Sequence, residues 1–177
     1  MRLLYRVRQF GRYLKARLTP GERQAAEARL GPRLAELFGR MTPAEQAHSV
    51  RVAQALAAEG QTEPDLLLAA LLHDVGKTRA PLGLWERTLV VVCGKFAPGL
   101  AERWGRADDG REAQGVFQRP FVIARQHPAW SAEMAECAGA PPRSVALIRR
   151  HQAAVPAPPQ TEEDRLLAAL QKADGEN

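Results

Sequence analysis

Apolar residues recur along most of the chain at helical spacing. The stretch from Thr42 to Glu45 has the form of a capping box with proline at the first helical position. His48, Val52 and Leu56 follow on one face of the helix that it starts. The stretch Asp65–His73 is apolar nearly all round, which predicts a central buried helix. No alternating strand pattern competes, so the sequence predicts an all-α bundle.

Start and stop signals delimit the remaining helices. They are expected over residues 20–30, 32–39, 84–92, 121–125, 128–139, 142–152 and 161–174. The β-branched run at 90–92 leaves a strand as the alternative for that segment. Residues 105–115 are predicted to form an exposed loop. Pro128 is expected to open a new helix, which would place His127 at its N-cap.

The segment Met1–Leu18 carries basic residues and no acidic one, with apolar residues at helical spacing. We expect a basic amphipathic helix docked on its own domain. Peripheral contact with an anionic membrane and contact with nucleic acid are the alternatives. The predicted organisation is a basic helical extension over residues 1–41 and a single helical domain over residues 42–177.

Bulk composition narrows the class of protein. The 177 residues suffice for one domain with a core, and the net charge of +5 is compatible with an anionic partner or with a solvated basic surface. The two cysteines, Cys93 and Cys137, form no CxxC pattern, which favours reduced thiols. The N-terminus lacks a signal-peptide core, and no apolar run could span a bilayer. A cytoplasmic location is therefore expected.

Candidate chemistry lies in the histidines and two aspartates. His73 and Asp74 end the most apolar stretch, where burying two titratable groups is costly without compensation. A divalent metal would compensate both, and a hydrogen-bonded core pair is the alternative. Asp174 falls on the apolar face of the last predicted helix, where a carboxylate is unusual without a partner. The alternative is that Asp174 is exposed to solvent near the last residue. His48, His127 and His151, taken singly, are equally compatible with core, capping or surface roles.

Together these residues follow the order His, His-Asp, His, His, Asp. The stretches that carry this order are HSVRVAQALA, LLAALLHDVGK, QHPAWSAEMAECAGAPPRSVALIRRHQ and LLAALQKADGEN. The chain here resembles the HD superfamily of metal-dependent phosphohydrolases. The resemblance implies metal ligands at His48, His73, Asp74, His127, His151 and Asp174, with Asp74 bridging two ions. A metal-bound hydroxide would then be the nucleophile.

A nitrogen and oxygen ligand set favours iron or manganese, with magnesium, nickel or cobalt as further choices. Asp74 and Lys77 are the expected catalytic residues, with Lys77 neutralising a phosphate oxygen. Arg149 and Arg150 are candidates for holding substrate phosphate. The expected partner is a small phosphorylated or nucleotide substrate. No nucleic acid is required, and the oligomeric state is left open.

The sequence also departs from the family pattern. The cyclic-di-GMP branch has two adjacent histidines and a Gly-Tyr-Pro loop, where this chain has His151-Gln152 and AAVPAPPQ. The layout is closer to compact branches that cleave nucleotides, dinucleoside polyphosphates or dinucleotides. Two alternatives to a hydrolase follow from the resemblance. One is a di-iron oxygenase of the same fold, such as myo-inositol oxygenase, and the other is a non-catalytic nucleotide-binding regulatory module.

Overall fold

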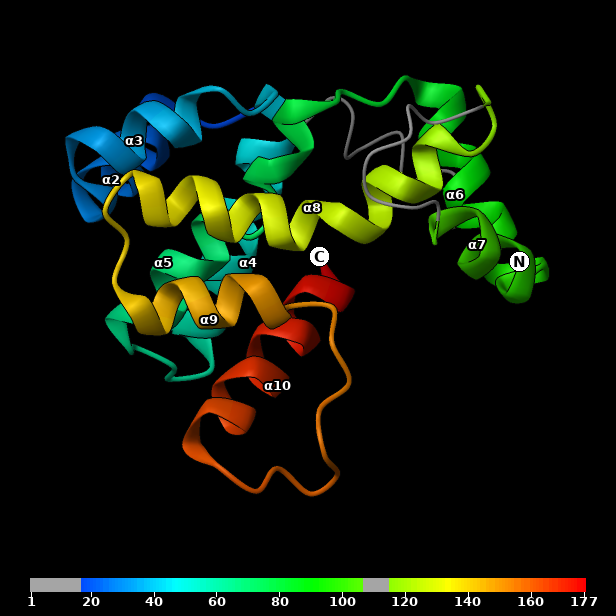
Figure 1. Ribbon diagram of the computed structural model, residues 1–177. Coiled ribbons are helices and arrows are strands. Elements are labelled where there is room, and N and C mark those ends of the chain that lie inside the picture. Colours follow the sequence, from blue (N-terminus) through cyan, green and yellow to red (C-terminus); the bar gives the residue numbers. More distant parts are fainter. Residues whose placement is uncertain (1–16, 107–114) are drawn as a thin grey trace, which may run out of the picture.

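A computed structural model describes residues 17–106 and 115–177 of the chain (Figure 1). No strand occurs in these two ranges, so the prediction of an all-α fold is confirmed. In chain order the helices are α2 Pro20–Leu30, α3 Pro32–Gly39, α4 Pro43–Ala58, α5 Pro64–Leu72, the 3₁₀ helix η1 Val75–Arg79, α6 Leu84–Phe96, α7 Pro98–Gly105, α8 Arg119–Cys137, α9 Pro142–Arg150 and α10 Glu162–Glu176.

Local capping fixes where several helices begin. Thr19, Thr42 and Thr161 each accept a hydrogen bond from the backbone of the third helical residue, whose carboxylate bonds back to the cap. These three capping boxes confirm the predicted starts of α2, α4 and α10. Gly31 has a φ of 71°, a conformation that favours glycine, and it separates α2 from α3.

Helix α5 lies at the centre of the bundle. Every residue from Leu66 to Leu72 is buried, as the apolar pattern predicts. Helices α4 and α9 pack on α5, α8 packs on α9 and on η1, and α10 packs on α4 (Figure 1). This arrangement brings the C-terminal end of α5 against elements that lie far apart in the sequence.

The helices of the predicted extension share the same core. Helices α2 and α3 contribute Ala26, Leu30, Leu34, Leu37 and Phe38 to the apolar cluster that also contains α5. The predicted division at residue 42 stays a prediction. The amphipathic helix predicted over Met1–Leu18 lies outside the described residues, except for Arg17 and Leu18. Leu18 packs against the core without helical structure.

The region around residues 84–137 differs most from the sequence prediction. The segment predicted to be helical over residues 84–92 forms helix α6, which continues to Phe96. Helix α7 was not predicted from the sequence. The loop expected over residues 105–115 falls almost wholly outside the described residues, and Gly105 itself ends α7. The prediction of two helices meeting at Pro128 is wrong, because α8 runs unbroken through it. His127 is therefore inside a helix and does not form an N-cap.

Within residues 17–106 and 115–177, no helix combines the length and the apolar character that a bilayer span needs.

Loss of core volume in α5 should destabilise the whole bundle. Leu66 is fully buried at the start of α5, away from His73, so Leu66→Ala should reduce the free energy of unfolding by about 2–5 kcal/mol. Leu100→Ala is the control, since Leu100 is 38% exposed on α7 and should cost only about 0.5 kcal/mol. Urea denaturation measures both values, and equal losses would contradict a core centred on α5.

Candidate metal centre

His73 and Asp74 lie at the end of the buried central helix. His73 caps α5 at its C-terminus and Asp74 precedes η1, and the two residues are only 1% and 4% exposed. The Nδ1 of His73 is 2.9 Å from the carbonyl oxygen of Ala70 and donates to it. Its Nε2 has no hydrogen-bond partner in the described part of the chain. That nitrogen lies 3.6 Å from Asp74 Oδ2 and 3.5 Å from Asp174 Oδ1.

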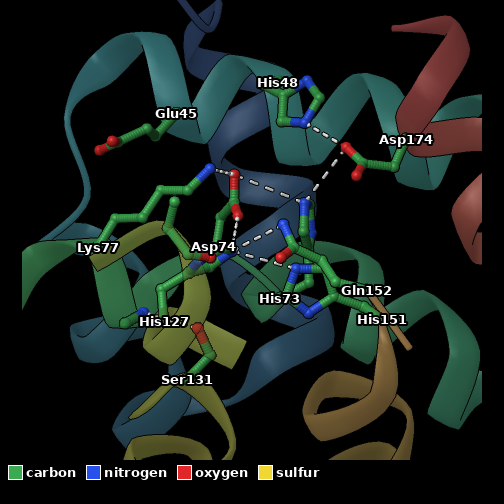
Figure 2. A network of polar contacts seen from close by, with 12 residues as sticks. Glu45, His48, His73, Asp74, Lys77, His127, Ser131, His151, Gln152 and Asp174 are labelled. Carbon is green, nitrogen blue, oxygen red and sulfur yellow. Dashed lines mark hydrogen bonds and ion pairs between the residues drawn. The ribbon is translucent and has the colours of Figure 1, made fainter. Parts of the chain in front are cut away.

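Side chains from distant helices converge on this pair (Figure 2). His48 on α4 reaches Asp174 on α10, with 2.8 Å between Nε2 and Oδ1. His127 on α8 has its Nε2 3.3 Å from Asp74 Oδ1 and 3.2 Å from Nε2 of His151, which caps the C-terminus of α9. The structure thus brings together all six side chains that the sequence singled out.

Hydrogen bonds at Nδ1 define how three of these imidazoles face the centre. His73, His127 and His151 each donate from Nδ1 to the carbonyl oxygen three residues earlier, at 2.9, 2.8 and 2.8 Å. A proton on Nδ1 leaves Nε2 as a lone-pair donor, which is the tautomer that binds metal. Their Nε2 atoms therefore face the centre as available ligands.

The spacing between His127 and His151 fits a shared cation. Two Nε2 lone pairs facing each other at 3.2 Å repel unless a positive charge lies beside both. Metal–nitrogen bonds of about 2.0–2.1 Å place two ligand nitrogens on one ion about 3.0–3.4 Å apart. The distance of 3.3 Å from His127 Nε2 to Asp74 Oδ1 falls in the same range.

The protonation states also suit a metal centre. Burial, together with the charge of His73, lowers the pKa of His151 to about 3, so this imidazole is neutral at physiological pH. Burial alone would raise the pKa of Asp74, but Lys77 and the neighbouring imidazoles hold it well below its usual range. Burial alone would lower the pKa of His73, whereas the carboxylates of Asp74 and Asp174 raise it. A cation bound between these carboxylates would therefore compete with the proton on His73.

Two groups of buried donors are close enough to hold ions, and Asp74 belongs to both. The first is His48, His73 and Asp74, the second is Asp74, His127 and His151, and within each group the ligand atoms lie within 4.8 Å of one another. Asp174 borders the first group through its contacts with His48 and His73. A set of imidazoles and carboxylates without thiolate fits borderline divalent ions such as iron and manganese.

A pocket of about 340 Å³ opens onto these donors. Lys77 lines it, with its Nζ 2.6 Å from Asp74 Oδ2. The two arginines that the sequence suggested for phosphate binding do not line it. Arg149 pairs with Glu136 at 3.6 Å and Arg150 pairs with Asp164 at 3.0 Å. Their predicted role has no support in this geometry.

Sequence reasoning missed two polar residues at the centre. Gln152 lines the pocket, with its Nε2 3.4 Å from His127 Nε2. Ser131 accepts a hydrogen bond of 2.8 Å from the backbone N–H of Gly76. A Cβ on Gly76 would collide with the backbone of His127 and lie 2.6 Å from Ser131 N, so glycine allows η1 to approach α8. Ser131 lies one turn after His127, a spacing that becomes informative only when α8 is continuous.

Pro128 explains how His127 keeps its orientation in the middle of a helix. His73 and His151 bond to carbonyls in the last turn of a helix, which lack the usual N–H donor four residues later. The Ile148 carbonyl also accepts a long bond of 3.4 Å from the backbone N–H of His151. His127 has no helix end nearby, but Pro128 has no N–H to give to the carbonyl of Ala124 four residues earlier. His127 Nδ1 donates to that carbonyl instead, at 2.8 Å.

Substituting Pro128 tests this arrangement. Pro128→Ala restores a backbone N–H that competes with His127 Nδ1 for the Ala124 carbonyl. We expect Mn²⁺ affinity, measured by calorimetric titration, to fall about 10–100-fold at one of two sites without a loss of folding stability. The ¹⁵N shifts of the imidazole should report a change of tautomer.

The control for this variant is Pro142→Ala. Pro142 is an exposed proline in the first turn of α9, where no carbonyl depends on its missing N–H. It should leave metal affinity unchanged. Unchanged affinity in Pro128→Ala as well would show that Pro128 does not position His127.

Comparisons with known proteins identify the family. A search of curated proteins and a search of solved structures each find no match. A family model described as HD domain matches residues 46–174, which is more than half of the 177-residue chain. The match runs from just before His48 to Asp174 and so contains all six converging side chains. The chain therefore belongs to the HD domain family, whose members are mostly metal-dependent phosphohydrolases.

Proposed function

We propose that this protein is a phosphohydrolase that cleaves a phosphoester or phosphoanhydride of a small, nucleotide-like substrate with two divalent ions. The observation that carries the proposal is the convergence of buried imidazole Nε2 atoms on Asp74 and Asp174, with Nδ1 of three imidazoles fixed by backbone carbonyls. Such a cluster of buried donors is costly to fold unless cations compensate it.

The proposed ligands divide between two ions. His48, His73 and Asp174 would hold one ion, His127 and His151 the other, and Asp74 would contact both. Two ions so placed would make hydroxide available at neutral pH and polarise a phosphoryl group. Iron or manganese suits these donors best, and magnesium, nickel or cobalt are further choices.

Lys77 is the residue best placed to assist the reacting phosphate. It lies on η1 at the pocket surface, while its Nζ contacts Asp74 Oδ2 at 2.6 Å. In this position the ammonium group would neutralise charge that develops on a phosphoryl oxygen in the transition state.

Asp74→Asn should remove the bound metal. The amide keeps the shape of the side chain but loses the charge that both proposed ions share. We expect metal content to fall nearly to zero by elemental analysis and kcat/KM to fall roughly 10³-fold or more. Asp65→Asn is the control, because Asp65 lies at the opposite end of α5 from Asp74 and accepts a bond from Ser144. Full metal content and activity in Asp74→Asn would refute the proposed site.

Lys77→Met should separate binding of metal from turnover. We expect the metal content to stay the same, because Lys77 is not a proposed metal ligand. The value of kcat/KM should fall about 10–10³-fold, because the positive charge that stabilises the transition state is lost. Lys172→Met is the matched control, since Lys172 pairs with Glu59 on the surface at 2.7 Å. Unchanged turnover in Lys77→Met would exclude the catalytic role, and turnover that requires dioxygen would favour an oxygenase.

A further inference from the structure

The pocket has two chemically different halves. Its polar half consists of His48, Asp74, Lys77, His127, Gln152 and Asp174. Its other half is hydrocarbon and consists of Leu82, Val90, Val91, Ile123 and Ala124, from the segment before α6, from α6 and from α8. A substrate whose phosphate reaches the polar half must place the rest of its body against the apolar half.

Apart from the two proposed ions, the polar half offers a single positively charged side chain. Lys77 is the one lysine or arginine among the described residues that line the pocket. Three arginines of other segments are engaged with carboxylates, in the pairs Arg79–Glu133, Arg119–Glu86 and Arg150–Asp164. With the ions and Lys77 engaged by the reacting phosphoryl group, a second or third phosphate would face hydrocarbon without a charged partner, which is costly.

The apolar half also lacks what a nucleobase needs. Among the described lining residues, the apolar half has no phenylalanine, tyrosine or tryptophan, so a base placed there would have no aromatic ring to stack on. The side chains of Val90, Val91 and Ile123 carry no donor or acceptor for the polar edges of a base. Gln152 is the only amide among the described lining residues, and its Nε2 lies 3.4 Å from the imidazole of His127.

From this division we infer that the preferred substrate is a phosphate monoester of an aliphatic alcohol, with the alkyl group against α6 and α8. The inference rests on the hydrolase chemistry of the proposed function and departs from its nucleotide-like substrate, because the described lining residues offer nothing that binds a base. The hydroxyl group of a water molecule adds to phosphorus as the P–O bond to the alcohol breaks. The second proton of that water molecule goes to the oxygen of the leaving alcohol. The products are the alcohol and inorganic phosphate.

Surface chemistry outside the pocket is compatible with longer chains. Val91 lines the pocket and is also 61% exposed, and further along α6 Phe96 is 74% exposed. An alkyl chain that outgrows the pocket would therefore pass over the exposed side chain of Val91 at its edge. Each buried methylene should increase transition-state binding about two- to fourfold in kcat/KM.

A substrate series tests the inference directly. The manganese-loaded protein is assayed for phosphate release from methyl, butyl and hexyl phosphate, and from a nucleoside mono- and triphosphate. We expect kcat/KM to rise with chain length and hexyl phosphate to exceed both nucleotides. A higher value for either nucleotide, or no dependence on chain length, would overturn the inference and leave the phosphohydrolase intact. Absence of metal-dependent release from every compound would overturn the proposed function as well.

Two isosteric variants locate the alkyl site. Val90→Thr puts a hydroxyl group into the wall of the pocket, whereas Val92→Thr changes a neighbouring residue that is 46% exposed and does not line it. The ratio of kcat/KM for butyl over methyl phosphate should fall at least threefold in Val90→Thr and stay constant in Val92→Thr. Metal content should be the same in both, which separates this effect from damage to the metal ligands. Equal ratios in the two variants would contradict the placement of the alkyl group against α6.

Discussion

The carboxylate of Asp74 is the group on which the rest of the centre depends. It is 4% exposed at the end of an apolar helix, and its two oxygens face Lys77, His73 and His127 at 2.6, 3.6 and 3.3 Å. An anion in this position is tolerable only if positive charge surrounds it. Helices from across the chain surround Asp74 with side chains. Some of these side chains carry positive charge themselves, and others are ligands for a cation that would supply it.

Helix ends turn this constraint into defined geometry. Carbonyls in the last turns of α5 and α9 lack the usual N–H donor four residues later, and His73 and His151 donate to them through Nδ1. Pro128 creates the same opening inside α8 for His127. One backbone rule therefore orients three imidazoles, and in each case the ring nitrogen that remains is directed at Asp74 and its neighbours. The glycine at 76 then lets η1 and α8 approach closely enough for the donors to meet.

Much of this could be predicted from the sequence, because capping boxes and apolar periodicity are local signals. The starts of α4 and α10 and the burial of α5 follow from such signals. The continuation of α8 could not be predicted from the local rule that proline opens a helix, since the compensating bond comes from His127 itself. The six converging residues could be predicted from the order of histidines and aspartates along the chain and from the family resemblance. The surface pairing of Arg149 and the pocket position of Gln152 depend on tertiary packing.

The central claim is that the six side chains hold two cations with Asp74 in common. Anomalous diffraction from crystals grown with Mn²⁺, recorded at the manganese edge, measures this most directly. Two peaks about 3.5–4 Å apart are expected, one beside His48, His73 and Asp174 and one beside His127 and His151, with Asp74 touching both. Crystals saturated with manganese that show no peak in this pocket, or peaks that Asp74 does not contact, would contradict this claim.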